Sequence, residues 1–245
     1  MSVYPVWVGT SGWVYPDWAG TVYPQGMKSA EAFGYYTRYF QTVELNSTFY
    51  HFPRESTVEK WQGSVPDGFV WAVKVWRRIT HFKRLHGVKK EVQDFFTRIS
   101  PLVKQGVCLV QLPPSMKKDL CRLKTFLKVL PASFRVAVEF RHNSWFSEDT
   151  YQLLRDFSVC LAGVDAPRIT RVVDIETSGF AYFRLHGRTK WYDYNYTRDD
   201  LMPFVEAVKD RRKRGDVFVY FDNTAYGQAF RNALDFTKEL CMKCP

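Results

Sequence analysis

Short runs of Val, Ile and aromatic residues recur along the chain and alternate with longer segments whose apolar residues follow a helical period. The short runs predict strands at residues 6–10, 42–46, 69–75, 106–112, 135–140, 159–165, 180–186 and 216–222. The longer segments predict helices at residues 29–39, 88–99, 119–130, 148–157, 198–214 and 227–242. Irregular connections are expected after the second strand, with a short helix near residues 56–61, and after the sixth strand, at residues 166–178.

Several of the predicted strands are almost continuously hydrophobic, which is typical of parallel strands buried on both faces. Strands that alternate with helices indicate an α/β fold with crossover helices. Eight such units in 245 residues favour a single (β/α)8 TIM-like barrel over an open doubly wound sheet. Because no Gly/Ser- or Pro-rich linker divides the sequence, we expect one domain over residues 1–245.

Composition excludes two classes of protein. Hydrophobic residues make up 46% and charged residues 24% of the chain, which is a globular and not a disordered mixture. The apolar stretches are too short to span a bilayer, and no signal peptide is evident, so we expect a cytoplasmic protein without a membrane partner. Five cysteines favour reduced thiols, and Cys241 and Cys244 are interpreted as a free dithiol near the C-terminus.

Polar residues stand where the predicted strands end. In a TIM-like barrel these ends meet at the mouth that holds the active site. The side chains proposed as catalytic are Glu44, Lys74, Glu139, Arg184, His186 and Asp222. The alternative is a buried ion-pair network that caps the barrel, with the two glutamates paired to Lys74 and Arg184.

Charge and aromatic residues point to an anionic ligand. The 35 Lys and Arg residues exceed the 25 Asp and Glu residues, which gives a net charge of +10. Aromatic residues in basic loops resemble the stacking surfaces of proteins that bind single-stranded nucleic acid, although they could instead pack the loops as lids. The residues proposed to bind nucleic acid are Trp13, Tyr15, Asn46, Arg77, His81, Arg141, His142, Trp145, Arg188, Trp191 and Asn223.

An ordered series of motifs spans almost the whole chain: GTSGWVYPDW, VELNSTFYHFP, KVWRRITHFKRL, QLPPS, VEFRHNSWF, YFRLHGR and YFDNTAYGQAFRNA. The series resembles the YecE-like family, also called domain of unknown function 72. The resemblance implies a TIM-barrel fold related in outline to endonuclease-IV-like and sugar-isomerase-like barrels. Family members commonly carry Asn where this sequence has Asp222, so this chain has an additional carboxylate at the expected mouth.

These features favour a metal-dependent nuclease, a hydrolase of phosphodiester bonds, acting on nucleic acid and most favourably on single-stranded DNA. Glu139, His186 and Asp222 are the candidate ligands of Mg²⁺ or Mn²⁺, and no organic cofactor is implied. Two alternatives stay open: a sugar or sugar-phosphate isomerase or lyase, and a non-catalytic nucleic-acid-binding protein. DNA or RNA preference, exonuclease or endonuclease action and protein partners are also left open.

Overall fold

The computed structural model describes residues 3–169 and 173–242 of the chain. Contacts divide the chain into two compact units. The first unit comprises residues 1–44, 163–174 and 179–245, and the second comprises residues 45–162 and 175–178. The expectation of one domain over residues 1–245 stays a prediction.

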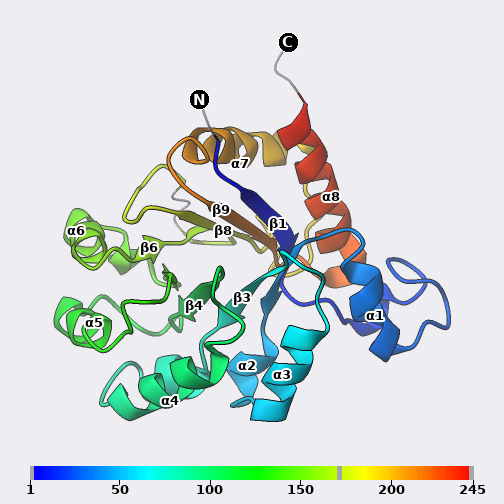
Figure 1. Cartoon of the computed structure of the whole chain (residues 1–245). Helices are drawn as coiled ribbons and strands as arrows, with labels where there is room; N and C mark the ends of the chain where they lie inside the picture. The colour runs from blue at the N-terminus through cyan, green and yellow to red at the C-terminus, as the bar shows by residue number, and fades with distance from the viewer. Residues whose placement is uncertain (1–2, 170–172, 243–245) are drawn as a thin grey trace. The chain divides into compact units, whose positions relative to one another are not determined.

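The first unit is built on a parallel four-stranded sheet in the order β1-β9-β8-β7. Strands β7, β8 and β9 are buried, β1 is buried only at its last two residues, and α8 runs beside β1 and β9 (Figure 1). The side chain of Thr197 accepts a hydrogen bond from the backbone N–H of Asp200, which fixes the start of α7. The elements of this unit are β1 Val6–Thr10, η1 Pro16–Trp18, α1 Ser29–Tyr36, β7 Gly163–Asp165, β8 Ala181–Leu185, α7 Arg198–Arg211, β9 Val217–Phe221, η4 Ala225–Gly227 and α8 Gln228–Cys241.

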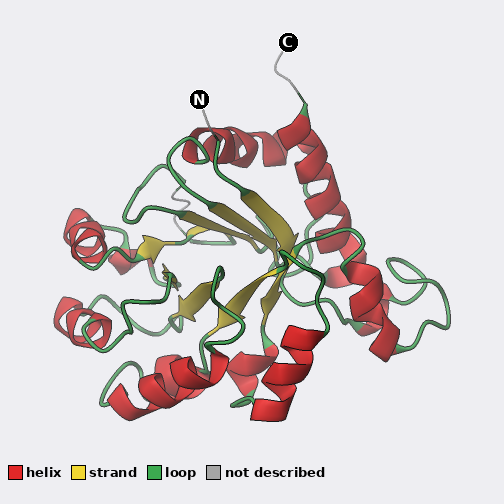
Figure 2. Cartoon of the chain, viewed as in Figure 1, coloured by secondary structure: helices red, strands yellow, loops and turns green. Residues whose placement is uncertain are grey.

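The second unit contains the sheet of order β2-β3-β4-β5-β6, whose edge strand β2 (Thr42–Leu45) crosses the boundary between the units. Helices follow its strands along the chain, as the colouring by secondary structure shows (Figure 2). The remaining elements are α2 Ser47–Tyr50, α3 Glu55–Gly63, β3 Val70–Lys74, the π-helical turn η2 Arg78–Phe82, α4 Lys89–Ile99, β4 Val107–Gln111, α5 Leu120–Leu127, β5 Val136–Glu139, η3 Asn143–Trp145, α6 Glu148–Asp156 and β6 Cys160–Leu161.

The α/β fold class expected from the sequence, parallel strands alternating with helices as in TIM-like barrels, is confirmed. One predicted strand differs, because residues 159–165 form two short strands, β6 and β7, separated at Ala162. β6 pairs with β5 and β7 pairs with β8, so the paired strands in the described residues belong to two sheets. The described part of residues 166–178 contains no helix, as expected, and α3 follows β2 as the predicted short helix.

No helix in residues 3–169 and 173–242 combines the length and the apolar character that crossing a bilayer requires. Of the two cysteines near the C-terminus, Cys241 is exposed, and Cys244 lies outside the described residues.

Two glycines of the first unit allow a matched test of packing. A Cβ atom added to Gly215 would lie 1.9 Å from the carbonyl oxygen of Gly179, whereas nothing lies within 4 Å of a Cβ added to Gly34 in α1. We therefore expect Gly215→Ala to lower the free energy of unfolding by about 1–3 kcal/mol, because the starts of β8 and β9 must move apart. Gly34→Ala should raise it by about 0.5–1 kcal/mol through helix propensity. Urea unfolding of both variants measures this, and equal effects would contradict the close approach of the strands.

Candidate active site

Strand register brings three polar residues to one edge of the first sheet. Leu185 of β8 pairs with Phe221 of β9, and the residues that follow them are His186 and Asp222. The backbone N–H of Asp222 donates to the carbonyl of Leu185 at 2.8 Å, and that of Ser11 donates to the carbonyl of Phe221 at 2.9 Å. The carboxyl end of this sheet therefore presents Ser11, His186 and Asp222 at the same level.

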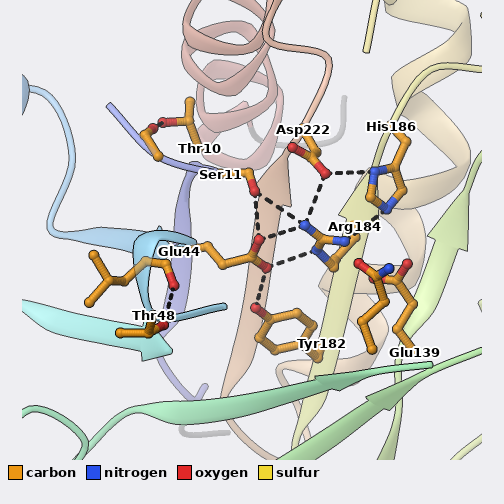
Figure 3. A network of polar contacts seen from close by, with 12 residues as sticks. Thr10, Ser11, Glu44, Thr48, Glu139, Tyr182, Arg184, His186 and Asp222 are labelled. Atoms are coloured by element: carbon orange, nitrogen blue, oxygen red, sulfur yellow. Dashed lines mark hydrogen bonds and ion pairs between the residues drawn. The ribbon is translucent and has the colours of Figure 1, made fainter. Parts of the chain in front are cut away.

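Arg184 lies at the centre of these residues (Figure 3). Its guanidinium donates to both oxygens of Glu44, from Nε at 2.8 Å and from Nη2 at 2.5 Å. Nη2 also lies 2.9 Å from Oδ2 of Asp222. Because Arg184 and Glu44 are fully buried, desolvation makes each charge costly unless the other compensates it. We call Ser11, Glu44, Tyr182, Arg184, His186 and Asp222 the arginine network.

Two hydroxyl groups complete the environment of Glu44. Ser11 Oγ donates to Oε1 at 2.6 Å, and Tyr182 Oη donates to Oε2 at 2.7 Å. Burial and then the negative charge of Glu44 raise the pKa of Tyr182, which keeps this donor protonated. Glu44 therefore accepts four hydrogen bonds and acts by positioning Arg184. Sequence reasoning missed Tyr182, although its place two residues before Arg184 puts both side chains on one face of β8.

His186 connects Arg184 to Asp222. Its Nδ1 lies 2.8 Å from Oδ2 of Asp222, and its Nε2 lies 3.1 Å from Nη1 of Arg184. Because a guanidinium can only donate, Nε2 accepts, and the ring proton lies on Nδ1 facing the carboxylate. His186 is fully buried, but the side chain of Asp222 is 11% exposed. Asp222 is therefore the carboxylate through which the network meets solvent.

Tyr15 lies close to these carboxylates. Its hydroxyl donates to the backbone carbonyl of Ser11. Burial and then the negative charges of Asp222 and Glu44 raise the pKa of Tyr15. The hydroxyl of Tyr15 therefore stays neutral, and its proton is directed to the carbonyl of Ser11.

The carboxylate of Asp222 fits Mg²⁺ better than Zn²⁺. Mg²⁺ is commonly held by one or two carboxylates together with substrate phosphates and water. Of the three expected metal ligands, His186 directs both ring nitrogens to the arginine network, and Glu139 pairs in the second unit with Arg141. Within residues 3–169 and 173–242, no three His, Cys, Asp or Glu side chains gather as a metal-binding group. Of the three expected ligands, only Asp222 keeps part of its side chain exposed to solvent.

In the second unit, cationic side chains surround His81. Burial lowers the pKa of His81 to about 4, and the next causes, in order, are the positive charges of Lys74, Arg141, Arg77 and Arg84. The ring of His81 packs edge-on against the ring of Phe49. Lys74 Nζ lies 4.5 Å from the centroid of the Phe49 ring. We call Lys74, Arg77, Arg84 and Arg141 the cationic cluster. The positive charges of this cluster disfavour protonation of His81, and a bound anion would offset them.

Arg77 also lies between two exposed aromatic rings. Its Cζ is 5.3 Å from the ring centroid of Tyr50 and 5.2 Å from that of Phe82. Tyr50 is 52% exposed and Phe82 is 67% exposed. Phe82 closes the π-helical turn η2, a geometry that is common at functional sites. The motif KVWRRITHFKRL, which contains Arg77 and Phe82, thus presents charge and aromatic surface together.

Glu139 ends β5 with its carboxylate fully buried, and Arg141 Nε donates to it. Arg141 Nη2 lies 3.5 Å from the side-chain oxygen of Gln111, the residue that pairs with Glu139 across β4 and β5. Ion pairs of this kind were the structural alternative for the polar strand ends, and the structure shows them for Glu139 and Glu44. Arg184 pairs with Glu44, as this alternative suggested, and Arg141 is a partner of Glu139 that the sequence did not suggest.

Two residues proposed to bind nucleic acid have structural roles instead. Trp145 is fully buried, stacks on Phe140 and donates through Nε1 to the carbonyl of Met116 at 2.7 Å. Asn223 is also buried, and its amide donates to the carbonyl of Tyr194 at 2.7 Å. Both side chains are buried beneath the surface. The sequence did not predict this, because both residues stand in polar loop sequence.

Apart from Arg141, which is buried, the other proposed binding residues are partly exposed. Trp191 packs against His186 with ring centroids 5.3 Å apart, and Trp13 packs against Phe33. Arg188 forms ion pairs with Asp165 and Asp200. His142 accepts from the backbone of Ser144 at the start of η3, and Asn46 precedes α2.

Two known proteins resemble this chain, one of them over nearly its whole length. UPF0759 protein YunF of Bacillus subtilis is 27% identical over 264 residues, covering 93% of this chain and 92% of that protein. UPF0759 protein YecE of Escherichia coli K12 is 32% identical over 145 residues, covering 58% of this chain and 51% of that protein.

Solved structures agree with these relatives. A DUF72 family protein of Thermotoga maritima has a TM-score of 0.88 and 33% identity, covering 97% of this chain and 99% of that one. One from Enterococcus faecalis has a TM-score of 0.83 at 21% identity, covering 98% and 97%, which shows the shared fold. The family profile described as protein of unknown function DUF72 matches residues 7–244. This chain therefore belongs to the DUF72 family.

Proposed function

We propose that this chain is a phosphodiesterase that acts on nucleic acid, with single-stranded DNA as the favoured substrate. The observation that carries the proposal is the cationic cluster around His81. After burial, the charges that act most strongly on this imidazole are all positive. Guanidinium and ammonium groups at such density suit phosphate oxygens, which accept charge-assisted hydrogen bonds. The chain's net charge of +10 supports the same class of ligand.

The aromatic rings beside Arg77 favour a single strand. Tyr50 and Phe82 are both more than half exposed, and exposing large apolar rings to water is unfavourable. Unpaired bases offer flat faces to such rings, whereas the bases of a duplex are already stacked on one another. Arginine beside these rings adds attraction to the phosphates that link the bases.

Asp222 is the residue that we assign to the chemical step. His186 and Arg184 hold its Oδ2, so the carboxylate is oriented before substrate binds. A divalent cation held by Asp222 would neutralise phosphate charge and lower the pKa of a bound water. Glu44 acts one step further away, because all its contacts serve to fix Arg184 and its neighbours.

The first test is hydrolysis of end-labelled single-stranded DNA with Mg²⁺ or Mn²⁺, read on a denaturing gel. Asp222→Asn keeps the shape of the side chain but removes its charge. We expect the rate of hydrolysis to fall by at least about 10²-fold. Asp235→Asn changes an exposed aspartate of α8 that pairs with Lys238, and it should leave the rate unchanged. Thermal unfolding of both variants controls for loss of the fold.

Full activity in a folded Asp222→Asn variant would contradict the proposed role of Asp222. Retention of DNA without cleavage by the unmodified protein would instead indicate a non-catalytic nucleic-acid-binding protein. Turnover of sugar phosphates with no action on DNA would indicate the isomerase or lyase alternative.

The second test concerns the phosphate contacts. We expect Arg77→Gln to weaken binding of a single-stranded oligonucleotide and to reduce the slope of log affinity against log salt by about one. Lys124→Gln, on the exposed side of α5, is the matched loss of one positive charge in the same unit and should change the slope much less. Fluorescence anisotropy at several salt concentrations measures both. Equal slopes for the two variants would show that net charge, and not the cationic cluster, governs binding.

The third test uses the imidazole as a sensor. Bound phosphodiester groups should favour the protonated ring and raise the pKa of His81 from about 4 by about one unit. By linkage, affinity for the oligonucleotide should then increase as the pH falls from about 6 towards 4. NMR titration of His81 with and without a short thymidine oligonucleotide tests this, and Arg77→Gln should reduce the rise. An unchanged pKa in a saturated complex would place the phosphates elsewhere.

A further inference from the structure

Two exposed tyrosines of the first unit have an unusual backbone. Tyr192 has φ of 64° and is 47% exposed, and Tyr226 has φ of 54° and is 62% exposed. Both lie in the left-handed region, where a side chain is disfavoured and glycine is the usual residue. Such outliers persist where surrounding structure enforces them, and they gather at binding and active sites.

Hydrogen bonds hold both tyrosines in place. The backbone N–H of Tyr192 donates to the carbonyl of His186 at 2.8 Å, and its carbonyl accepts from the N–H of Ala225 at 3.0 Å. The loop after β8 is thereby joined to the loop after β9, one residue before Tyr226. Tyr226 is in turn fixed through its N–H by Asp17 and through its carbonyl by Arg231. The two rings are therefore displayed on a rigid base.

The same loops continue from the arginine network. The ring of Tyr192 lies 6.1 Å from that of His186 and 6.0 Å from that of Trp191. Trp191 in turn packs 5.3 Å from His186, between the network and the loop surface. Tyr226 follows Asp222 by four residues and lies within the turn η4. Exposed aromatic surface thus adjoins the carboxylate that meets solvent.

We propose that Tyr192 and Tyr226 form a stacking platform for a nucleobase of the substrate, which we call the tyrosine platform. This inference rests on the proposed function and adds to it the part of the substrate that the first unit recognises. A flat, unsaturated ring suits a tyrosine face, and stacking is tolerant of base identity because every base has a π-face. The neighbouring Lys190, paired with Asp193 and mostly exposed, supplies positive charge for the linking phosphate.

The test exploits the strained backbone. Glycine at positions 192 and 226 removes each ring and relieves the left-handed conformation. We therefore expect the double variant Tyr192→Gly/Tyr226→Gly to unfold at an equal or higher temperature than the unmodified protein. It should nevertheless lose most of its preference for an oligonucleotide with bases. The double variant Tyr192→Phe/Tyr226→Phe, which retains both rings, should keep that preference.

Binding is measured by anisotropy at fixed salt with two single-stranded probes, six thymidine nucleotides and six abasic nucleotides, which carry the same phosphates. The unmodified protein should bind the thymidine probe roughly ten-fold more tightly, and the double glycine variant should show a much smaller preference, because only Tyr50 and Phe82 then remain to stack on bases. Retention of the full preference in the double glycine variant would overturn the proposal. So would a lower unfolding temperature with no change in preference, because it indicates a structural role.

The outcome is separate from that of the proposed function. Base-dependent binding that is largely lost in the double glycine variant, with no cleavage of any probe, would support the tyrosine platform while refuting hydrolysis. Equal binding and cleavage of both probes would refute the platform while supporting hydrolysis. Binding of neither probe would overturn both.

Discussion

The site in the first unit depends on one buried guanidinium. Arg184 is removed from water completely, and Glu44 and Asp222 supply the negative charge that makes its burial tolerable. Replacing such a network with apolar side chains often costs a protein little stability, so burial of the ion pair is by itself weak evidence that it stabilises the fold. What it achieves is orientation: residues from β2, β8 and the ends of β1 and β9 are fixed relative to one carboxylate at the surface.

The arginine network and the cationic cluster differ in the sign of their formal charge. The arginine network holds two carboxylates and one guanidinium and is therefore formally negative. The cationic cluster of the second unit imposes a positive field on His81, which suits an anion.

Much of the fold could be predicted because parallel buried strands and amphipathic helices leave strong local patterns. The strand from residue 159 to 165 was predicted as one because Ala162 interrupts no hydrophobic run, and only pairing shows that its two halves belong to different sheets. The ends of the strands were informative, since Glu44, Arg184, His186 and Asp222 converge as proposed. The burial of Trp145 and the backbone of Tyr192 and Tyr226 could not be predicted, because both depend on contacts between distant segments.

The pairing of β1 with β9 also constrains how the protein forms. Val6 pairs with Val217 and Thr10 with Phe221, so the first sheet joins segments that are far apart in the sequence. Pairing over such a sequence separation is slow, because a long loop must close before any contact compensates for its entropy. During translation, Glu44 emerges long before Arg184 and must stay hydrated until its partner arrives. Glu44 and Arg184 are buried as a pair in the folded protein. Burial of Glu44 must therefore wait until β8, which carries Arg184, has been made.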